Sequence, residues 1–268
     1  MRKGLLALFA ALAGRGPQGA GERFELLREA GRRLVPDYRF KWPQMAWWRD
    51  REFNAYLERF GERGGGNDDR RWMLGQLLRL VAGVPGDTAE CGVYRGAGSY
   101  LICSVNAAQR GAPRRHFVFD SFAGLSAPTA VDGTHWTRGD LACGAEEVRQ
   151  VLAEFPGVSL HPGWIPTRFP DVADRRFAFV HIDVDLYEPT RDSLAFFYPR
   201  MSEGGVILCD DYGFTSCPGA TQAVDEFLAA RLEKMIALSC GGGFLLKGRA
   251  TSSALIAPAS APGPDPAG

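Results

Sequence analysis

The sequence has no excess of charge of either sign. Its 31 Lys and Arg residues balance 31 Asp and Glu residues, so the chain has neither the basic field that attracts a phosphate backbone nor a strongly acidic one. Nucleic acid is therefore not an expected partner. Beyond the first residues, the sequence also lacks an apolar run long enough to cross a bilayer, and we expect no membrane partner.

Paired cysteines are missing as well. The six cysteines include no CxxC pair, and several fall in predicted strands or helices, where a thiol serves as a small hydrophobic side chain. This predicts free thiols and a cytoplasmic protein. The start, Met1-Arg2-Lys3 followed by an apolar run to Gly14, resembles a short secretory signal, and an amphipathic helix gives the same pattern.

The composition suits one α/β domain with added ends. With 268 residues and 46% hydrophobic content, the chain can bury an ordinary core. Residues 1–66, rich in Arg and aromatics, are predicted to form an N-terminal helical cap or lid, and residues 67–249 the main domain. Residues 250–268, rich in Ala, Pro and Ser, are predicted to be disordered.

Strand-like and helix-like segments alternate through the main domain. This alternation predicts a doubly wound, mostly parallel sheet. The predicted strands are 88–93, 116–120, 158–162, 177–183 and 205–210, and the predicted helices are 70–82, 99–109, 145–154, 190–198 and 219–232. The last predicted pair, 234–239 and 244–247, is separated by three glycines and indicates an antiparallel hairpin at the sheet edge.

The first predicted strand leads into a glycine-rich turn. Its glycines, in Glu90-Cys91-Gly92-Val93-Tyr94-Arg95-Gly96-Ala97-Gly98-Ser99, do not follow the GxGxxG order of dinucleotide dehydrogenases. Glycines still allow a ligand to approach the backbone closely, and an acidic residue that ends the next strand commonly binds ribose hydroxyls. Asp120, followed by Ser121, occupies that place. The two motifs together favour a cofactor pocket.

A carboxylate before the glycines indicates what the cofactor is. Glu90 suits a ligand with a positive charge, such as the methionine ammonium of S-adenosylmethionine. The segment from Gly139 to Cys143, including Asp140, and the loop from Gly163 to Pro166 follow the second and third strands, where an adenine ring would lie. The sequence alone supports these two segments weakly.

Four carboxylates follow two apolar strands that are consecutive in the sequence. Asp183 ends one strand, and Asp210 and Asp211 end the next. If these parallel strands are neighbours, the three carboxylates lie within reach of one hard cation. Asp185, two residues further along, would lie on the loop past the strand end, where its carboxylate could accept a proton.

These motifs together resemble a known family. The chain has GxxxGxG after a strand, FDSFAGL (residues 119–125), HIDVDLYEPT (181–190), FYPRMSEGGVILCDDYG (197–213) and PGATQAVDEF (218–227). In this combination it resembles the macrocin O-methyltransferase family, which methylates sugar hydroxyls of bacterial antibiotics. The resemblance covers roughly residues 70–248.

The resemblance implies a class I, Rossmann-like methyltransferase that uses S-adenosylmethionine and Mg²⁺. It implies Asp183, Asp210 and Asp211 as metal ligands and Asp185 as the general base. The residues expected to contact the donor are Glu90, Gly92, Val93, Tyr94, Gly96, Gly98, Ser99, Asp120, Ser121, Asp140, Cys143 and Asp183. The expected substrate is a small-molecule glycoside, and a homo-oligomer is expected for a soluble enzyme of this size.

Other interpretations remain open at this point. Asp185 and Asp211 could instead cap helices or turns, and His181 is more typical of a packed histidine than of a base. His135 lies on a loop that faces either substrate or solvent. The rival functions are a catechol or phenol O-methyltransferase, with a flatter acceptor pocket, and a non-catalytic scaffold of the same fold.

Overall fold

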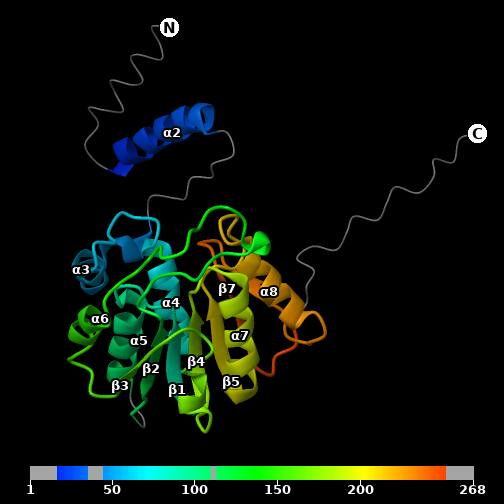
Figure 1. Ribbon diagram of the computed structural model, residues 1–268. Helices are drawn as coiled ribbons and strands as arrows, with labels where there is room; N and C mark the ends of the chain where they lie inside the picture. The colour runs from blue at the N-terminus through cyan, green and yellow to red at the C-terminus, as the bar shows by residue number, and fades with distance from the viewer. Residues whose placement is uncertain (1–16, 36–44, 110–112, 252–268) are drawn as a thin grey trace, which may run out of the picture. The chain divides into compact units, whose positions relative to one another are not determined.

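The computed structural model describes residues 17–35, 45–109 and 113–251 (Figure 1). The apolar start of the chain and nearly all of the predicted disordered tail lie outside these residues. The chain separates into two compact units, Met1–Glu58 and Arg59–Gly268. The predicted boundary, after residue 66, falls eight residues later.

The first unit is helical in its described part, as predicted for the N-terminal region. It contains α2 (Pro17–Leu34), the 3₁₀ helix η1 (Ala46–Arg49) and most of α3 (Arg51–Arg59). Asp50 begins α3, because its Oδ1 accepts a hydrogen bond from the backbone N–H of Phe53 at 2.9 Å. A carboxylate at this position satisfies a backbone donor that has no partner within the helix.

The second unit is built on one mixed sheet of seven strands. The order is β3-β2-β1-β4-β5-β7-β6, parallel from β3 to β5 and antiparallel at β7 and β6. The strands are β1 (Asp87–Cys91), β2 (His116–Asp120), β3 (Val158–Pro162), β4 (Phe177–Ile182), β5 (Met201–Cys209), β6 (Ile236–Ala237) and β7 (Gly243–Leu246). The predicted parallel sheet and antiparallel C-terminal hairpin are confirmed.

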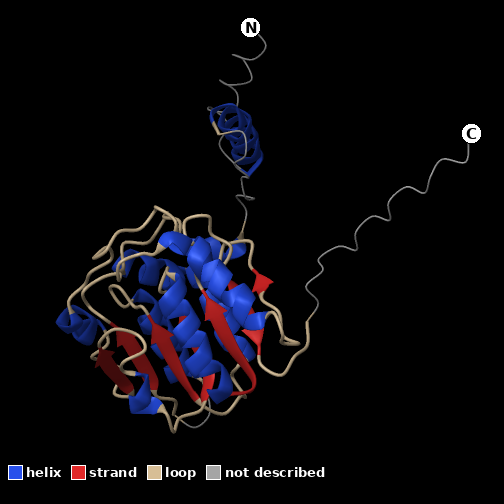
Figure 2. Cartoon of the chain, turned by 45° about the vertical axis from the view of Figure 1, so that its right-hand side comes forward, coloured by secondary structure: helices blue, strands red, loops and turns tan. Residues whose placement is uncertain are grey.

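Helices cover both faces of this sheet, as Figure 2 shows. One face packs on α4 (Asp68–Leu80) and α5 (Ala97–Ala108), through Leu78, Ile102 and Phe179. The other face packs on α7 (Tyr187–Phe197) and α8 (Pro218–Leu228), through Leu194 and Val224. The remaining short elements are α6 (Ala145–Val151), η2 (Ala130–Asp132), η3 (Phe169–Val172) and η4 (Tyr198–Arg200).

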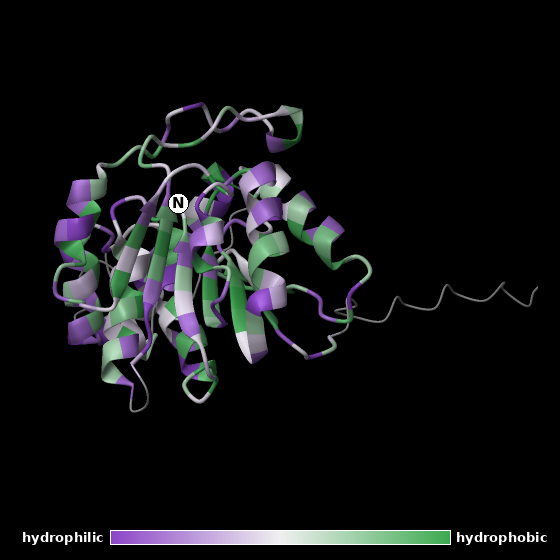
Figure 3. Cartoon of the chain, turned by 60° about the horizontal axis from the view of Figure 1, so that its bottom comes forward, coloured by the Kyte–Doolittle hydropathy of each residue, from purple (hydrophilic) through white to green (hydrophobic). Residues whose placement is uncertain are grey.

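The central strands are hydrophobic on both faces, which is typical of a parallel sheet between two helical layers. Every residue of β4 is buried, and the strands in Figure 3 are largely coloured as hydrophobic while hydrophilic residues lie on the outer sides of the helices. This core fixes the strand ends, and with them the side chains that follow each strand.

The element boundaries differ from the predicted ones by a few residues. The helix expected from residue 190 begins at Tyr187, because Asp132 Oδ1 accepts the backbone N–H of Tyr187 at 2.7 Å. That acceptor is the last residue of η2, 55 residues away in the sequence, so no local signal predicts it. The helix expected to reach residue 232 ends at Leu228, and β5 begins at Met201 rather than 205.

Two smaller observations bear on the predictions made from absent features. All six cysteines lie in the described part of the chain, and all are free thiols, as expected. No helix within the described ranges is long and apolar enough to span a membrane.

Candidate active site

The candidate site lies where the strand order reverses, between β1 and β4. In open α/β sheets, ligands bind at the carboxyl ends of the strands at this point. The three strand ends are held in line by backbone hydrogen bonds, from Asp183 N to Cys91 O at 2.9 Å and from Asp210 N to Ile182 O at 2.8 Å. A cavity of about 700 Å³ opens above them, a size typical of small-molecule sites.

Two glycines lie where any side chain would collide with neighbouring residues. A Cβ on Gly92, which has φ +76°, would meet the Asp183 backbone, with the carbonyl carbon at 2.9 Å. A Cβ on Gly98 would collide with the Glu90 carboxylate, whose carbon would be 3.0 Å away. The glycine-rich turn therefore fits tightly against the two carboxylate-bearing strands, and both glycines line the cavity.

Glu90 is a buried carboxylate with its partners in place. It is only 1% exposed, its Oε1 lies 2.7 Å from His181 Nδ1, and its Oε2 accepts a hydrogen bond from Ser99 Oγ. Burial alone would raise its pKa, but the hydrogen bond and the charge of His181 outweigh burial and lower the pKa. The ionised form is therefore favoured at the cavity wall, where it can attract a cationic ligand.

Asp120 ends β2 and holds the glycine-rich turn. Its Oδ2 accepts the backbone N–H of Val93 at 2.8 Å and its Oδ1 accepts that of Phe122 at 2.7 Å. Burial raises the pKa of Asp120, and these backbone hydrogen bonds oppose the rise. With both oxygens oriented by the backbone, the carboxylate lines the cavity with lone pairs that ligand hydroxyls can use.

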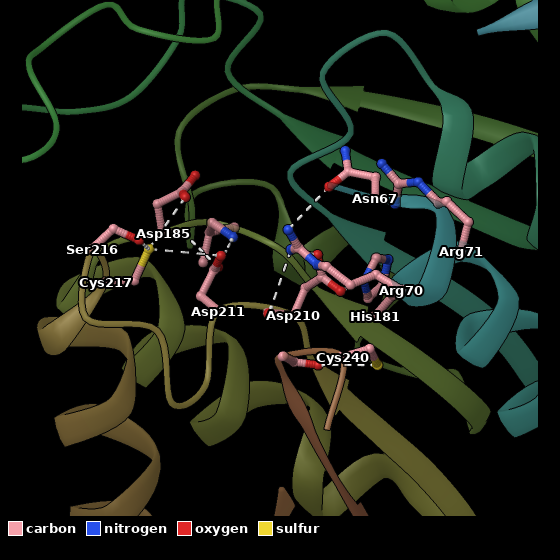
Figure 4. A network of polar contacts seen from close by, with 12 residues as sticks. Asn67, Arg70, Arg71, His181, Asp185, Asp210, Asp211, Ser216, Cys217 and Cys240 are labelled. Atoms are coloured by element: carbon pink, nitrogen blue, oxygen red, sulfur yellow. Dashed lines mark hydrogen bonds and ion pairs between the residues drawn. The ribbon is translucent and has the colours of Figure 1, made fainter. Parts of the chain in front are cut away.

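The four predicted carboxylates all line the same cavity, on the side of β4 and β5. Among the described residues, possible metal-ligating atoms within 4.8 Å of one another form two groups, His181, Asp183 and Asp210, and Asp185, Asp211 and Cys217. The three carboxylates predicted to bind one cation are thus divided between two groups, and Figure 4 shows Asp210 with His181 in one group and Asp211 with Asp185 and Cys217 in the other.

Asp210 forms an ion pair with an arginine side chain. The Arg70 guanidinium, from α4, forms an ion pair with Asp210 Oδ2, and His181 Nε2 lies 3.5 Å from Asp210 Oδ1. His181 is completely buried and is held by Glu90 through its other ring nitrogen, so it is a packed, hydrogen-bonded histidine. Its imidazole ring therefore lies between the carboxylates of Glu90 and Asp210.

Asp211 holds the loop that carries Asp185. Its Oδ2 accepts the backbone N–H groups of Val184 and Asp185 at 3.0 and 2.8 Å, and Asp185 adopts a left-handed conformation with φ +60°. Burial and the charge of Asp183 raise the pKa of Asp211 to about 6. Burial and then the charges of Asp211 and Asp183 raise the pKa of Asp185 to about 9.

A thiol and an indole complete this side of the cavity. Cys217 Sγ lies 3.6 Å from Asp185 Oδ1 and 3.9 Å from Asp211 Oδ1. Trp136 Nε1 donates to the same sulfur at 3.4 Å. Burial, and next the charge of Asp211, raise the pKa of Cys217 to about 12, so the thiol is protonated at neutral pH.

The structure brings most of the predicted donor residues to the cavity wall and leaves some away from it. Glu90, Gly92, Val93, Tyr94, Gly98, Asp120, Ser121 and Asp183 line it, whereas Gly96, Ser99, Asp140 and Cys143 are not among its lining residues. Ser99 supports Glu90 from behind. Asp140 instead accepts the N–H of Thr137 at 2.8 Å, and Cys143 lies 3.3 Å from Glu147.

Several lining residues were not predicted as site residues from the sequence. Arg70 lies in a helix-like pattern, and nothing near it in the sequence indicates a partner 140 residues away. Cys217 was considered only as a free thiol. Of the loop around His135, it is Trp136 that lines the cavity, while His135 is exposed.

The donor set of the acidic side fits a hard cation. Asp183, Asp185, Asp210 and Asp211 gather at one wall, and Arg70 pairs only with Asp210 among the ion pairs of the described residues. Neighbouring buried carboxylates disfavour each other's ionised forms, as the raised pKa values of Asp185 and Asp211 show. A divalent cation with oxygen ligands would relieve this repulsion.

A family model described as Macrocin-O-methyltransferase (TylF) matches residues 74–237 of the chain. The chain is 37% identical over 152 residues to the 8-demethyl-8-(2,3-dimethoxy-alpha-L-rhamnosyl)-tetracenomycin-C 4'-O-methyltransferase of Streptomyces olivaceus, covering 53% of this chain and 58% of that protein. It is 35% identical over 158 residues to the demethyldecarbamoylnovobiocin O-methyltransferase of Streptomyces niveus, covering 54% and 59%. The chain thus spans about six tenths of the length of these curated relatives.

Solved structures share the fold. The O-methyltransferase NovP is 31% identical, with a TM-score of 0.57, and the alignment covers 67% of this chain and 80% of NovP. CalS11, a calicheamicin methyltransferase, is 20% identical, with a TM-score of 0.63, and the alignment covers 88% of this chain and 95% of the CalS11 chain. The second likeness concerns the fold alone.

Proposed function

The chain belongs to the macrocin O-methyltransferase family, and from that premise we propose that it transfers a methyl group from S-adenosylmethionine to a sugar hydroxyl of a glycosylated natural product, with Mg²⁺. The observation that carries the proposal is the convergence of two kinds of carboxylate on one cavity. Glu90 and Asp120 lie on one side, and Asp183, Asp185, Asp210 and Asp211 lie on the other.

Residues 67–249 are proposed as the methyltransferase domain, and within it the strand ends β1 and β2 as the donor half of the site. Glu90, held ionised by His181, suits the ammonium group of the donor, and Asp120 suits its ribose hydroxyls. Gly92 and Gly98 let the turn pack closely against Asp183 and Glu90, where a Cβ at either glycine would collide. With the donor bound in this way, we propose that its sulfonium methyl group points toward the acidic side of the cavity.

The acceptor half is proposed to hold the cation through Asp183, Asp210 and Asp211. When bound, Mg²⁺ would polarise an acceptor hydroxyl and, by its charge, lower the pKa of the neighbouring Asp185. Asp211 fixes the Asp185 loop through two backbone hydrogen bonds. It thereby sets where the Asp185 carboxylate sits relative to the acceptor.

Asp185 is proposed as the general base. The acceptor oxygen forms a bond to the donor's methyl carbon as the carbon–sulfur bond breaks, and the hydroxyl proton passes to the Asp185 carboxylate. A base of this kind contributes about 10²- to 10⁴-fold to a rate. Alignment of oxygen, carbon and sulfur contributes a further proximity effect, which reaches roughly 7–11 kcal/mol in favourable cases.

The names of the relatives support a sugar acceptor. The Streptomyces olivaceus relative acts on a rhamnosyl group of a tetracenomycin, and a Micromonospora griseorubida relative, 31% identical over 163 residues, is a mycinamicin III 3''-O-methyltransferase. The first name specifies a compound that carries a rhamnosyl group, and the second specifies O-methylation of mycinamicin III at its 3'' position. A sugar hydroxyl is a weak acid, so it also needs the base and the cation that the acidic half of the cavity is proposed to supply.

The test is methyl transfer from S-adenosylmethionine to a panel of deoxysugar glycosides and free catechols, with Mg²⁺ and with EDTA, followed by mass spectrometry. We expect a methylated glycoside that EDTA abolishes. Asp185→Asn should lower kcat by about 10²-fold or more and leave the affinity for S-adenosylhomocysteine within about threefold.

Three other results would lead to different conclusions. Products confined to catechols would favour a phenol methyltransferase. A protein that fails to bind S-adenosylhomocysteine would be a scaffold. A large loss of donor affinity in Asp185→Asn would exclude Asp185 as the base.

A further inference from the structure

We propose that Asp185, Asp211 and Cys217 form a capture site for a thiophilic divalent cation such as Zn²⁺ or Cd²⁺, which shares Asp211 with the proposed Mg²⁺ site and blocks that site when occupied. All three side chains are at least 94% buried, with exposed fractions of 6%, 5% and 3%. Each offers one ligand atom, and these atoms lie within 4.8 Å of one another.

The thiol donates long hydrogen bonds to both carboxylates, and the same distances are close to those around a coordinated metal ion. Cys217 Sγ lies 3.6 Å from Asp185 Oδ1 and 3.9 Å from Asp211 Oδ1. A tetrahedral Zn²⁺ with a Zn–S bond of about 2.3 Å and Zn–O bonds of about 2.0–2.2 Å separates sulfur from oxygen by about 3.5–3.7 Å. The two sulfur–oxygen separations are therefore already close to those of a coordinated ion, and small side-chain rotations would suffice.

The charge of the group also calls for a cation. Neither Asp185 nor Asp211 forms an ion pair among the described residues, since Arg70 pairs with Asp210. The Arg70 guanidinium thus forms its ion pair with a different carboxylate, and a bound divalent cation would bring positive charge into direct contact with both Asp185 and Asp211. The cavity lies open to all three side chains, so a water molecule or an acceptor hydroxyl can supply the fourth ligand that an open zinc site requires.

The sulfur atom selects the class of metal. Thiolate is a soft ligand that favours Zn²⁺ and its heavier relatives, whereas Mg²⁺ takes oxygen ligands. Binding replaces the thiol proton of Cys217, which passes to solvent, with the metal. The consequence for catalysis rests on the proposed function: the captured ion would occupy the base, Asp185, and remove Asp211 from the Mg²⁺ site.

The experiment is a titration of the metal-free full-length protein with Cd²⁺, monitored by the ultraviolet charge-transfer absorption of a cadmium–thiolate bond. Cys217→Ser is the test variant. The matched control is Cys143→Ser, because Cys143 is also beside a carboxylate, with Glu147 Oε2 at 3.3 Å, but belongs to no group of three ligands among the described residues. Thermal unfolding checks that both variants fold.

We expect one Cd²⁺ per chain, a thiolate band retained in Cys143→Ser, and loss of the band with at least about 100-fold weaker binding in Cys217→Ser, since even supporting groups around a metal are worth 10- to 100-fold. A band that survives in Cys217→Ser, or disappears in Cys143→Ser, overturns the proposal. So does a wild-type protein with no band.

A second readout separates this inference from the proposed function. If the wild-type protein transfers methyl groups, a stoichiometric amount of Zn²⁺ should inhibit it, excess Mg²⁺ should relieve the inhibition, and Cys143→Ser should respond in the same way. If the Cys217-dependent Cd²⁺ band forms but no methyl transfer occurs with any acceptor, the metal site stands and the proposed function falls. If Zn²⁺ at one equivalent leaves turnover unchanged, the blocking role is refuted.

Discussion

Gly98→Ala tests the donor half of the site through a single methyl group. Gly98 is the second residue of α5, where alanine would ordinarily stabilise the helix by about 1 kcal/mol. The added Cβ would overlap Glu90 Oε1, and the carboxyl carbon would lie 3.0 Å away. Glu90 must therefore move, although His181 Nδ1 at 2.7 Å and Ser99 hold it.

The expected magnitude combines these effects. Overpacking costs about 1–3 kcal/mol, and a hydrogen bond lost by buried His181 costs about 1–3 kcal/mol, so the net loss after the helix gain of about 1 kcal/mol is roughly 1–5 kcal/mol. That corresponds to a fall in Tm of roughly 2–20 °C for a domain of this size. Displacement of Glu90 should also weaken binding of S-adenosylhomocysteine by about 30-fold or more.

The matched control is Gly75→Ala, in the interior of α4, where the new Cβ would meet nothing within 4 Å. We expect this variant to be slightly more stable than the wild type, by about 0.5–1 kcal/mol, with unchanged ligand affinity. Thermal unfolding and isothermal titration calorimetry measure both quantities. If Gly98→Ala is as stable as Gly75→Ala and binds the ligand within threefold of wild type, the tight fit between α5 and Glu90 is refuted.

The remaining predictions concern the acidic half. Burial and neighbouring charges raise the folded-state pKa of Asp185 to about 9, so between pH 6.5 and 8 the native state keeps a proton that the unfolded chain has lost. The stability of the metal-free protein should therefore fall as pH rises, by at most about 1.4 kcal/mol per pH unit. Urea unfolding of Asp185→Asn should show this slope removed, and an unchanged slope would contradict the assignment. Arg70→Met leaves buried Asp210 without its ion-pair partner and should destabilise the metal-free protein by about 3 kcal/mol. Mg²⁺ should restore part of that loss, and an equal loss with and without Mg²⁺ would place the cation elsewhere.

The parts of the site that the sequence predicts are those set by strand ends. Apolar runs that lead to Asp120, Asp183 and Asp210 form strands of one parallel sheet. Because the apolar segments must all be buried between the helical layers, the strands align and their carboxyl ends lie at the same edge of the sheet. Glu90 could be assigned because it interrupts an apolar strand just before the glycines. These predictions need only residues that are neighbours in the sequence.

The parts that escaped prediction depend on contacts between distant segments. Arg70 reaches Asp210 only because α4 packs over β5, and Cys217 approaches Asp185 only because α8 begins beside the loop after β4. The start of α7 depends on Asp132, the last residue of η2, which accepts the backbone N–H of Tyr187. Asp140 was predicted to contact the donor because it follows the second strand. Its carboxylate instead accepts a hydrogen bond from the backbone N–H of Thr137, three residues earlier, and stabilises a turn.

The two halves of the cavity differ in how far the protein itself satisfies them. On the donor side, both oxygens of Glu90 and of Asp120 have hydrogen-bonding partners from the protein, so this wall is formed before any ligand arrives. On the acidic side, burial and the neighbouring carboxylates raise the pKa values of Asp185 and Asp211, and the charge of Arg70, which forms its ion pair with Asp210, only partly opposes the rise. A preformed donor wall lowers the ordering cost of binding, whereas the acidic wall gains stability only when a cation binds to it. Ligands that differ in charge should therefore affect stability differently: S-adenosylhomocysteine should raise Tm at any pH where Glu90 is ionised, and the gain from Mg²⁺ should grow as pH rises and the carboxylates lose their protons.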